Sequence, residues 1–447
     1  MARMHIGIVA SLLAAISASV GAARAVEFPA LCQPASAPLH APAVESVLVA
    51  MEKAVLAGDI EGYLTRVVPA APHAASGWVG DPVFRKEQEN WAADFKLHAP
   101  AEFDLKLEPV EGAAVETEPV QGAGAAAEAE KEEEVPGEVD PARTARARDE
   151  HRCKLTITWR MKPGEDGAAR KERRVSYPAV FVKIGEAWLF AGEDWKVVSG
   201  PAYSEQSGPG VVKYLGDARD IAERVAEVLP EIRRHVDAGF ENVPSITQEV
   251  KIYPRMGHLQ ESIYLSYTDP LSGWNEPGEA IKILGGNRMM SDGLRPLLAH
   301  EYGHVATFQY GEHATNMPWW LVEGVAELSS EGVSPMLAKH TDEVVKAWAR
   351  SGELAPWDEL TDFRTCKPRW HGHVYRQGHH MVAYVSDAYG RGGRNAWLRS
   401  MAVGKSIDEA SREALGASFE ELSLRWRATL PQQGVPEADA TAEEPPK

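Results

Sequence analysis

The segment Leu297–Glu327, LLAHEYGHVATFQYGEHATNMPWWLVEGVAE, contains the most informative pattern in the second half of this 447-residue chain. It contains the pattern H-E-x-x-H at residues 300–304, and Glu323 follows His304 after 18 intervening residues. Residues four positions apart lie one turn apart on the same face of a helix. His300 and His304 can therefore direct their imidazoles at one metal ion. Glu301 points to the side, where it can reach a water molecule on that ion.

The residues around this pattern predict two helices. Ser291 or Asp292 is a natural N-cap for the first helix, and Gly311 can end it. Pro318 suits the first turn of a second helix, which carries Glu323. The apolar stripe of the first helix consists of Leu297, Leu298, Val305 and Phe308.

The residue types predict a zinc site. Zinc in hydrolytic sites takes three protein ligands and keeps one position for water. We predict His300, His304 and Glu323 as the ligands and Glu301 as the general base. Glu327 shares the helix face of Glu323, so its carboxylate can hydrogen-bond a ligand imidazole and hold it in place. Without a metal, two histidines and three carboxylates would converge unpartnered, which is costly in a buried setting.

At these residues the sequence resembles the gluzincin metallopeptidases, the clan of thermolysin and aminopeptidase N-like enzymes. The shared features are H-E-x-x-H, the 18-residue spacing, Glu323-Gly324 and the carboxylate at Glu327. A closer likeness is to the bacterial peptidase MA-like proteins, through three later segments. These are Tyr375–Tyr384 with the following Tyr389-Gly390, a helix that begins at Ser406, and a helix that includes Leu415–Leu422. The resemblance spans residues 211–430.

The resemblance implies hydrolysis of peptide bonds, a zinc ion as cofactor and a peptide or protein as substrate. By its position in the family pattern, Tyr375 is the candidate donor to the oxyanion, with His371 and His373 as rivals. A second metal site among these two histidines, His379 and His380 is not predicted. Only His379 and His380 are expected to be helical, and adjacent side chains on a helix diverge.

One segment upstream of the zinc motif departs from the aminopeptidase pattern. Aminopeptidase N-like enzymes carry a Gly-x-Met-Glu-Asn segment that holds the amino terminus of the substrate, whereas this chain reads WNEPGEAI at residues 274–281. Glu276 or Glu279 can mimic that contact, but the pattern is absent, so we predict no exopeptidase specificity. We expect the strand at residues 280–284 to be a sheet edge on which a peptide lies as an added strand.

Two further readings of the site stay open. The first is a binding or scaffold protein that holds zinc on a peptidase fold without catalysis. The complete pattern at Glu301 argues against it, because a structural site needs no base and is usually closed by a fourth protein ligand. The second is a hydrolase that acts on a bond other than a peptide bond.

The first half of the chain predicts helices followed by an antiparallel sheet. Apolar residues recur at helical spacing within residues 44–68 and 84–95. In the segments that follow, every second residue is apolar, as in a strand. Residues 43–200 weakly resemble the nuclear transport factor 2-like fold, a cone of helices and curved sheet. The predicted fold class is therefore α+β. The cone-like domain is followed at residues 211–430 by a mostly helical, zincin-type domain with a small edge sheet, and strands are expected at residues 247–253 and 261–266.

The ends of the chain and its net charge predict where the protein is located and which partners it binds. Residues 1–25 match a cleavable signal peptide, with Arg3, an apolar stretch and cleavage after Ala25, which predicts a secreted or periplasmic protein. No stable membrane insertion is then expected. The net charge of −18 argues against nucleic-acid binding. A flexible leader at 26–42, a disordered acidic insertion at 111–149 and a disordered tail at 431–447 complete the predicted organisation.

The three cysteines are too few for a disulfide framework. Cys32, Cys153 and Cys366 allow at most one bridge, and none forms a C-x-x-C pair that would suggest a thiolate metal site.

Overall fold

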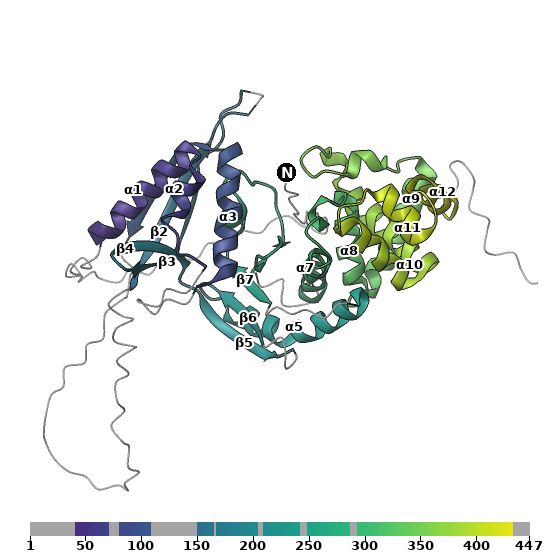
Figure 1. Ribbon diagram of the computed structural model, residues 1–447, viewed down its shortest axis with the longest axis horizontal. Helices are drawn as coiled ribbons and strands as arrows, with labels where there is room; N and C mark the ends of the chain where they lie inside the picture. The colour runs from purple at the N-terminus through teal and green to yellow at the C-terminus, as the bar shows by residue number, and fades with distance from the viewer. Residues whose placement is uncertain are drawn as a thin grey trace, which may run out of the picture. The chain divides into compact units, whose positions relative to one another are not determined.

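The computed structural model describes residues 41–70, 80–108, 150–164, 167–203, 209–241, 248–286 and 293–431. These residues form two compact units, shown in Figure 1. The first unit ends at Asp194 and also includes Tyr264–Tyr267, whereas the second comprises Trp195–Ile263 and the chain from Thr268 onward. The predicted signal peptide and acidic insertion lie outside the described residues, as do nearly all of the leader and the tail.

The first unit has the predicted order of helices followed by an antiparallel sheet. Its helices are α1 (Ala41–Ala57), α2 (Ile60–Leu64) and α3 (Pro82–Leu97). Its four strands pair in sequence order, as β1 (Pro100–Glu108), β2 (Glu150–Met161), β3 (Arg173–Ile184) and β4 (Ala187–Glu193). The turn between β3 and β4 contains Gly185, whose left-handed φ of 64° favours glycine. Alternate residues of β1 and β2, such as Leu105 and Ile157, are paired and buried, which explains the alternation in the sequence.

The second unit contains a five-stranded sheet. Its strands are β5 (Lys196–Ala202), β6 (Pro209–Tyr214), β7 (Glu249–Tyr253), β8 (Gly273–Trp274) and β9 (Ile281–Leu284), in the order β5-β6-β7-β9-β8. β6, β7 and β9 run parallel, whereas β5 and β8 are antiparallel to their neighbours. The predicted boundary of the first domain at residue 200 falls within β5, which belongs to the second unit.

Two predictions about strands were wrong. The expected edge strand, β9, pairs with β7 on one side and with β8 on the other, so the edge strands of the described sheet are β8 and β5. The strand expected at residues 261–266 is replaced by the end of helix α6 (Met256–Ile263). In this helix Leu259 and Ile263, four residues apart, are both buried, so helical packing outweighs the short alternation at residues 263–265.

Helices make up the remainder of the second unit. The long helices are α5 (Arg219–Phe240), α7 (Leu294–Phe308), α8 (Trp319–Glu331), α9 (Pro335–Ser351) and α10 (His371–Ala402), and the short ones are α11 (Ile407–Leu415), α12 (Phe419–Ala428), η2 (Ala314–Asn316), η3 (Trp357–Leu360) and η4 (Pro368–Trp370). Within the described part of the chain, no helix has both the length and the apolar character needed to span a membrane.

The helix ends are partly as predicted. Both late helices have capping boxes, formed by Ser406 with Glu409 and by Ser418 with Glu421. The pattern Ser-x-x-Glu at each start predicts them. Helix α7 instead begins after Gly293, which provides no side-chain cap, and it ends at Phe308 rather than Gly311. Ser291 and Asp292 lie outside the described residues.

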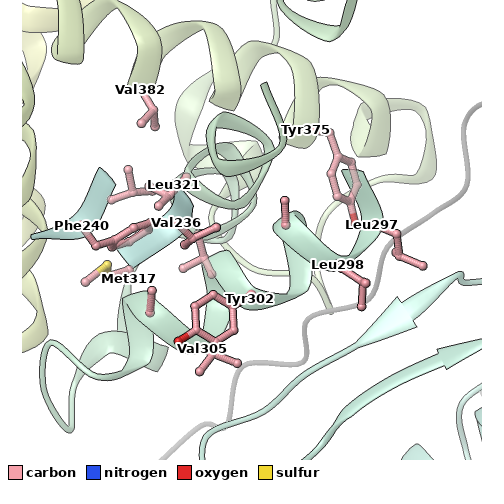
Figure 2. Close-up of a cluster of buried hydrophobic side chains, with 14 of the residues drawn as sticks. Val236, Phe240, Leu297, Leu298, Tyr302, Val305, Met317, Leu321, Tyr375 and Val382 are labelled. Carbon is pink, nitrogen blue, oxygen red and sulfur yellow. The ribbon is translucent and has the colours of Figure 1, made fainter. Parts of the chain in front are cut away.

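The core of the second unit lies among α5, α7, α8 and α10. Figure 2 shows Phe240 of α5, Tyr302 and Val305 of α7, Leu321 of α8 and Val382 of α10 in this cluster. All five side chains are buried. Burial of this apolar surface fixes α7 against α8, and these are the helices that carry the predicted metal ligands.

The backbones of α8 and α10 meet at two glycines. A Cβ atom on Gly324 would lie 2.5 Å from the carbonyl carbon of Gly378, and one on Gly378 would collide with the carbonyl oxygen of Trp320. Only glycine permits this approach, so the helix contact depends on both residues.

The Gly378→Ala variant is expected to lower the free energy of unfolding by about 1–3 kcal/mol, because the added methyl group must push α8 and α10 apart. Gly372→Ala in the same helix is the matched control. Nothing lies within 4 Å of the added atom there, so its effect should stay below about 1 kcal/mol. Urea unfolding of both variants measures the difference, and equal stabilities would contradict the close contact.

Candidate metal centre

Helices α7 and α8 bring the three predicted ligands together. The Nε2 atom of His300 lies 3.2 Å from Glu323 Oε2 and 3.2 Å from the Nε2 atom of His304. The His304 Nε2 atom lies 3.6 Å from the same carboxylate oxygen. All three side chains are buried, and among the described residues they are the one group of three or more His, Cys, Asp or Glu side chains whose ligand atoms converge closely enough for a metal ion.

The sequence of α7 allows this close approach of α8. Gly303 lies between the two histidines, and a Cβ atom there would lie 2.7 Å from Ser329 Oγ and 3.1 Å from the Cα atom of Ala326. A larger residue would hold α8 away from α7. The glycine therefore allows Glu323 to reach the two imidazoles.

Unpartnered atoms beside the group fit a water molecule. Both carboxylate oxygens of Glu301 are buried without a hydrogen-bond partner in the described structure. Two imidazole nitrogens and one carboxylate oxygen form the donor set that zinc takes in hydrolytic sites, with a position left for water. The residues present thus fit the ion that the sequence predicts.

Burial and charge pairing shift the pKa values of these groups in different directions. Burial opposes the charged form of His300, but its hydrogen bonds to Glu323 and Glu327 raise the pKa of the imidazole to about 10. Burial also opposes the charge of Glu323, but His304 and His300 lower the pKa of this carboxyl group to about 2. Glu301 lacks such a partner, so burial raises its pKa to about 8. Without a cation, the protonated imidazole of His300 thus balances the buried charge of Glu323, and a bound cation would take over this role.

Three carboxylates follow one face of α8 at four-residue intervals. Glu323 faces the imidazoles, and Glu327 Oε1 lies 3.3 Å from the Nδ1 atom of His300. The structure thus places Glu327 where the spacing predicts, on the ring nitrogen opposite the metal-facing one. One turn further, Glu331 Oε2 lies 3.1 Å from His379 Nε2, a pairing that the sequence did not suggest.

Tyr375 lies beside the group, on α10. Its side chain is buried, and its ring centroid lies 6.4 Å from that of His300 and 6.1 Å from that of Trp319. The rival His371 also touches Trp319, with 5.5 Å between ring centroids. The other rival, His373, stacks on Trp348. Of the three candidates, Tyr375 is the one whose ring contacts a predicted ligand.

The other histidines of α10 have their own partners. The expectation that His371 and His373 lie outside a helix was wrong, because α10 begins at His371. His373 Nε2 lies 2.9 Å from the Glu353 carbonyl oxygen, and His380 Nε2 lies 3.3 Å from Asp342 Oδ1. These histidines do not converge with one another on a second metal-binding group in the described chain.

The sheet edge passes close to Glu301. A Cβ atom on Gly273 of β8 would collide with the Glu301 carboxylate, so the absence of a side chain there makes room for it. The nearby Glu276 is buried, and Glu279 is buried in a 2.9 Å ion pair with Lys282. The ion pair makes Glu279 the weaker candidate for contact with the amino terminus of a substrate.

The two cysteines in the described part of the chain form no disulfide bridge with each other. Cys153 and Cys366 are free thiols, and burial raises the pKa of Cys153 to about 12 and that of Cys366 to about 11. Cys32 lies outside the described residues.

Comparison with known proteins gives a structural likeness alone. No protein-family model and no curated protein sequence matches the chain. Among solved structures, the M1 zinc metallopeptidase from Deinococcus radiodurans is similar at 12% identity and a TM-score of 0.37, over 60% of this chain and 58% of that one. A variant of that peptidase bound to a Tyr-Ser-Ala substrate gives a TM-score of 0.36, with the same identity and coverage. The chain thus spans less than two thirds of these structures.

The Glu327→Ala variant is expected to bind zinc about 10–100-fold more weakly than the parent protein, because His300 loses the carboxylate that orients its ring. Competition with a chromogenic chelator measures the affinity. Glu331→Ala is the matched control, since its carboxylate contacts His379 instead, and it should leave the affinity unchanged. Equal affinities for Glu327→Ala and the parent protein would show that the Glu327 contact does not support the site.

Proposed function

We propose that this chain is an exported, zinc-dependent metallopeptidase that hydrolyses peptide bonds. The single observation that carries the proposal is the buried His300–His304–Glu323 group with the unpartnered carboxylate of Glu301 beside it. A structural zinc site is normally closed by four protein ligands, whereas this group offers three and a candidate base. Export to the periplasm or the medium rests on the signal-peptide pattern at residues 1–25.

Each residue of the group has a separate task in this proposal. His300, His304 and Glu323 hold the zinc ion, and Glu327 fixes the ring of His300 through its Nδ1 atom. When bound, zinc supplies Lewis acidity, which polarises a peptide carbonyl and makes water more acidic. Glu301 orients the attacking water and accepts its proton. This role requires the carboxylate form of Glu301, which burial alone disfavours and a nearby cation would favour.

Tyr375 is proposed to donate a hydrogen bond to the carbonyl oxygen of the scissile bond as negative charge develops there. Its ring lies beside that of His300, and a phenol is a suitable donor for such an oxygen. This assignment rests on proximity and on the position of the residue in the sequence.

The substrate is proposed to bind as an extended peptide along β8. This strand replaces β9 in the role because it forms an edge of the described sheet and passes against Glu301. An extended chain can pair with an edge strand through main-chain hydrogen bonds, which places a peptide bond near the edge without selecting particular side chains. No preference for a free amino terminus is proposed.

The Glu301→Gln variant tests the proposed activity. It keeps the size of the side chain but cannot accept a proton, so kcat on a quenched-fluorescence peptide library should fall about 10²–10⁴-fold. Zinc content should stay the same. Glu331→Gln, changed at a carboxylate outside the group, should keep both activity and zinc.

Three outcomes separate the readings. Cleavage by the parent protein that is lost in Glu301→Gln and after chelation supports the peptidase. Zinc binding without cleavage of any peptide would favour either the non-catalytic binding protein or a hydrolase that acts on a bond other than a peptide bond. Cleavage that survives in Glu301→Gln would remove Glu301 from the role of base.

A further inference from the structure

We propose that Trp319 is a positioning residue that makes Glu323 a one-oxygen ligand of the metal. This inference rests on the proposed zinc site and adds a residue that the sequence pattern does not include. Trp319 is the first residue of α8, four positions before Glu323. Its indole Nε1–H donates a 2.9 Å hydrogen bond to Glu323 Oε1.

The two carboxylate oxygens of Glu323 thus face different partners. Oε1 accepts the indole hydrogen bond, whereas Oε2 lies 3.2 Å from His300 Nε2 and 3.6 Å from His304 Nε2. A hydrogen bond to an ionised acceptor is stronger than one between neutral groups, so Oε1 is held firmly. Oε2 is therefore the one carboxylate oxygen of Glu323 that remains available to a metal ion.

Trp319 itself has little freedom to move. Its side chain is fully buried, and its backbone N–H donates to the carbonyl oxygen of Thr361 at 2.9 Å. The indole ring packs edge-on against three aromatic rings at centroid distances of 5.0–6.1 Å, those of Phe363, His371 and Tyr375. A donor fixed on several sides can hold the Glu323 carboxylate in one rotamer.

This arrangement has a consequence for coordination. A carboxylate free to turn can bind a cation through both oxygens and thereby fill an additional coordination position. Because hydrolytic zinc sites need a position for water, an indole that engages Oε1 keeps that position available. The ring of Trp319 also packs on Tyr375, so one side chain supports both a metal ligand and the proposed oxyanion donor.

The Trp319→Phe variant removes the N–H donor and keeps an aromatic ring. Zinc affinity, measured by chelator competition, should fall about 10–100-fold, as for other groups that orient metal ligands. With cobalt(II) in place of zinc, the visible absorption should weaken, because a second carboxylate oxygen raises the coordination number. Trp320→Phe is the matched control, since its ring packs on Trp357 at 4.4 Å instead and both readouts should stay unchanged.

A double-mutant cycle separates positioning from general support of the fold. In a Glu323→Ala background, Trp319→Phe should cause no further loss of the residual zinc affinity, because the carboxylate through which it acts is gone. Equal losses in both backgrounds would assign Trp319 a merely structural role. Parent-like affinity and an unchanged cobalt spectrum in the single variant would overturn the inference while leaving the peptidase proposal intact. Failure of the parent protein to bind zinc would overturn both.

A measurement on the parent protein covers the case in which Trp319→Phe does not fold. With ¹⁵N-labelled indole groups, the 13 tryptophans give separate N–H resonances. Loading with zinc should shift one of them strongly, since Trp319 is the tryptophan of the described chain whose indole donates to a predicted ligand carboxylate. An indole spectrum that is identical with and without zinc would overturn the inference.

Discussion

The second unit depends on how the charge of one completely buried carboxylate, Glu323, is balanced. An ionised carboxylate without partners costs several kcal/mol in a protein interior. Here two imidazoles and one indole N–H surround it, and each partner comes from α7 or from the first turn of α8. The geometry that offsets the burial cost also leaves three donor atoms facing one point. Stability and metal binding therefore draw on the same contacts.

This balance requires that the helices pack closely. Gly303 lets α8 approach α7, and the pair Gly324 and Gly378 lets α10 approach α8. The large apolar side chains of the core then fill the remaining space and hold the three helices at these distances. Small residues at the crossings and large ones around them thus set the position of every predicted ligand. The carboxylates Glu327 and Glu331 extend the same pattern along α8, each in contact with a histidine.

The sequence predicted the parts of the site that depend on helical spacing. The four-residue interval places His300 and His304 on one face of α7, and Glu323 and Glu327 on one face of α8. The packing of α7 on α8 then brings the two faces together. The helices and strands with regular apolar periods were also recovered, including both capping boxes. These features are local, so the sequence contains what is needed to predict them.

Features that depend on long-range pairing were missed. The composition of the strand at residues 281–284 fits an edge strand and a central strand equally well. The pairing with β8 makes it a central strand. The start of α10 at His371 has no side-chain cap that a local pattern could reveal, and His371 contacts the rings of Trp319 and Phe363 outside its own helix. The hydrogen bond from Trp319 to Glu323 does have a local signal, a donor four residues before a ligand, but tryptophan is usually assigned to the core.

The metal content of the purified protein from residue 26 onward, beside that of a His304→Ala variant, shows whether His300, His304 and Glu323 hold zinc. We expect about one zinc ion per chain in the parent protein, as three ligands define a single site. The variant should lose the ion because two ligands remain. The absence of zinc from both proteins after incubation with the metal would rule out the zinc site.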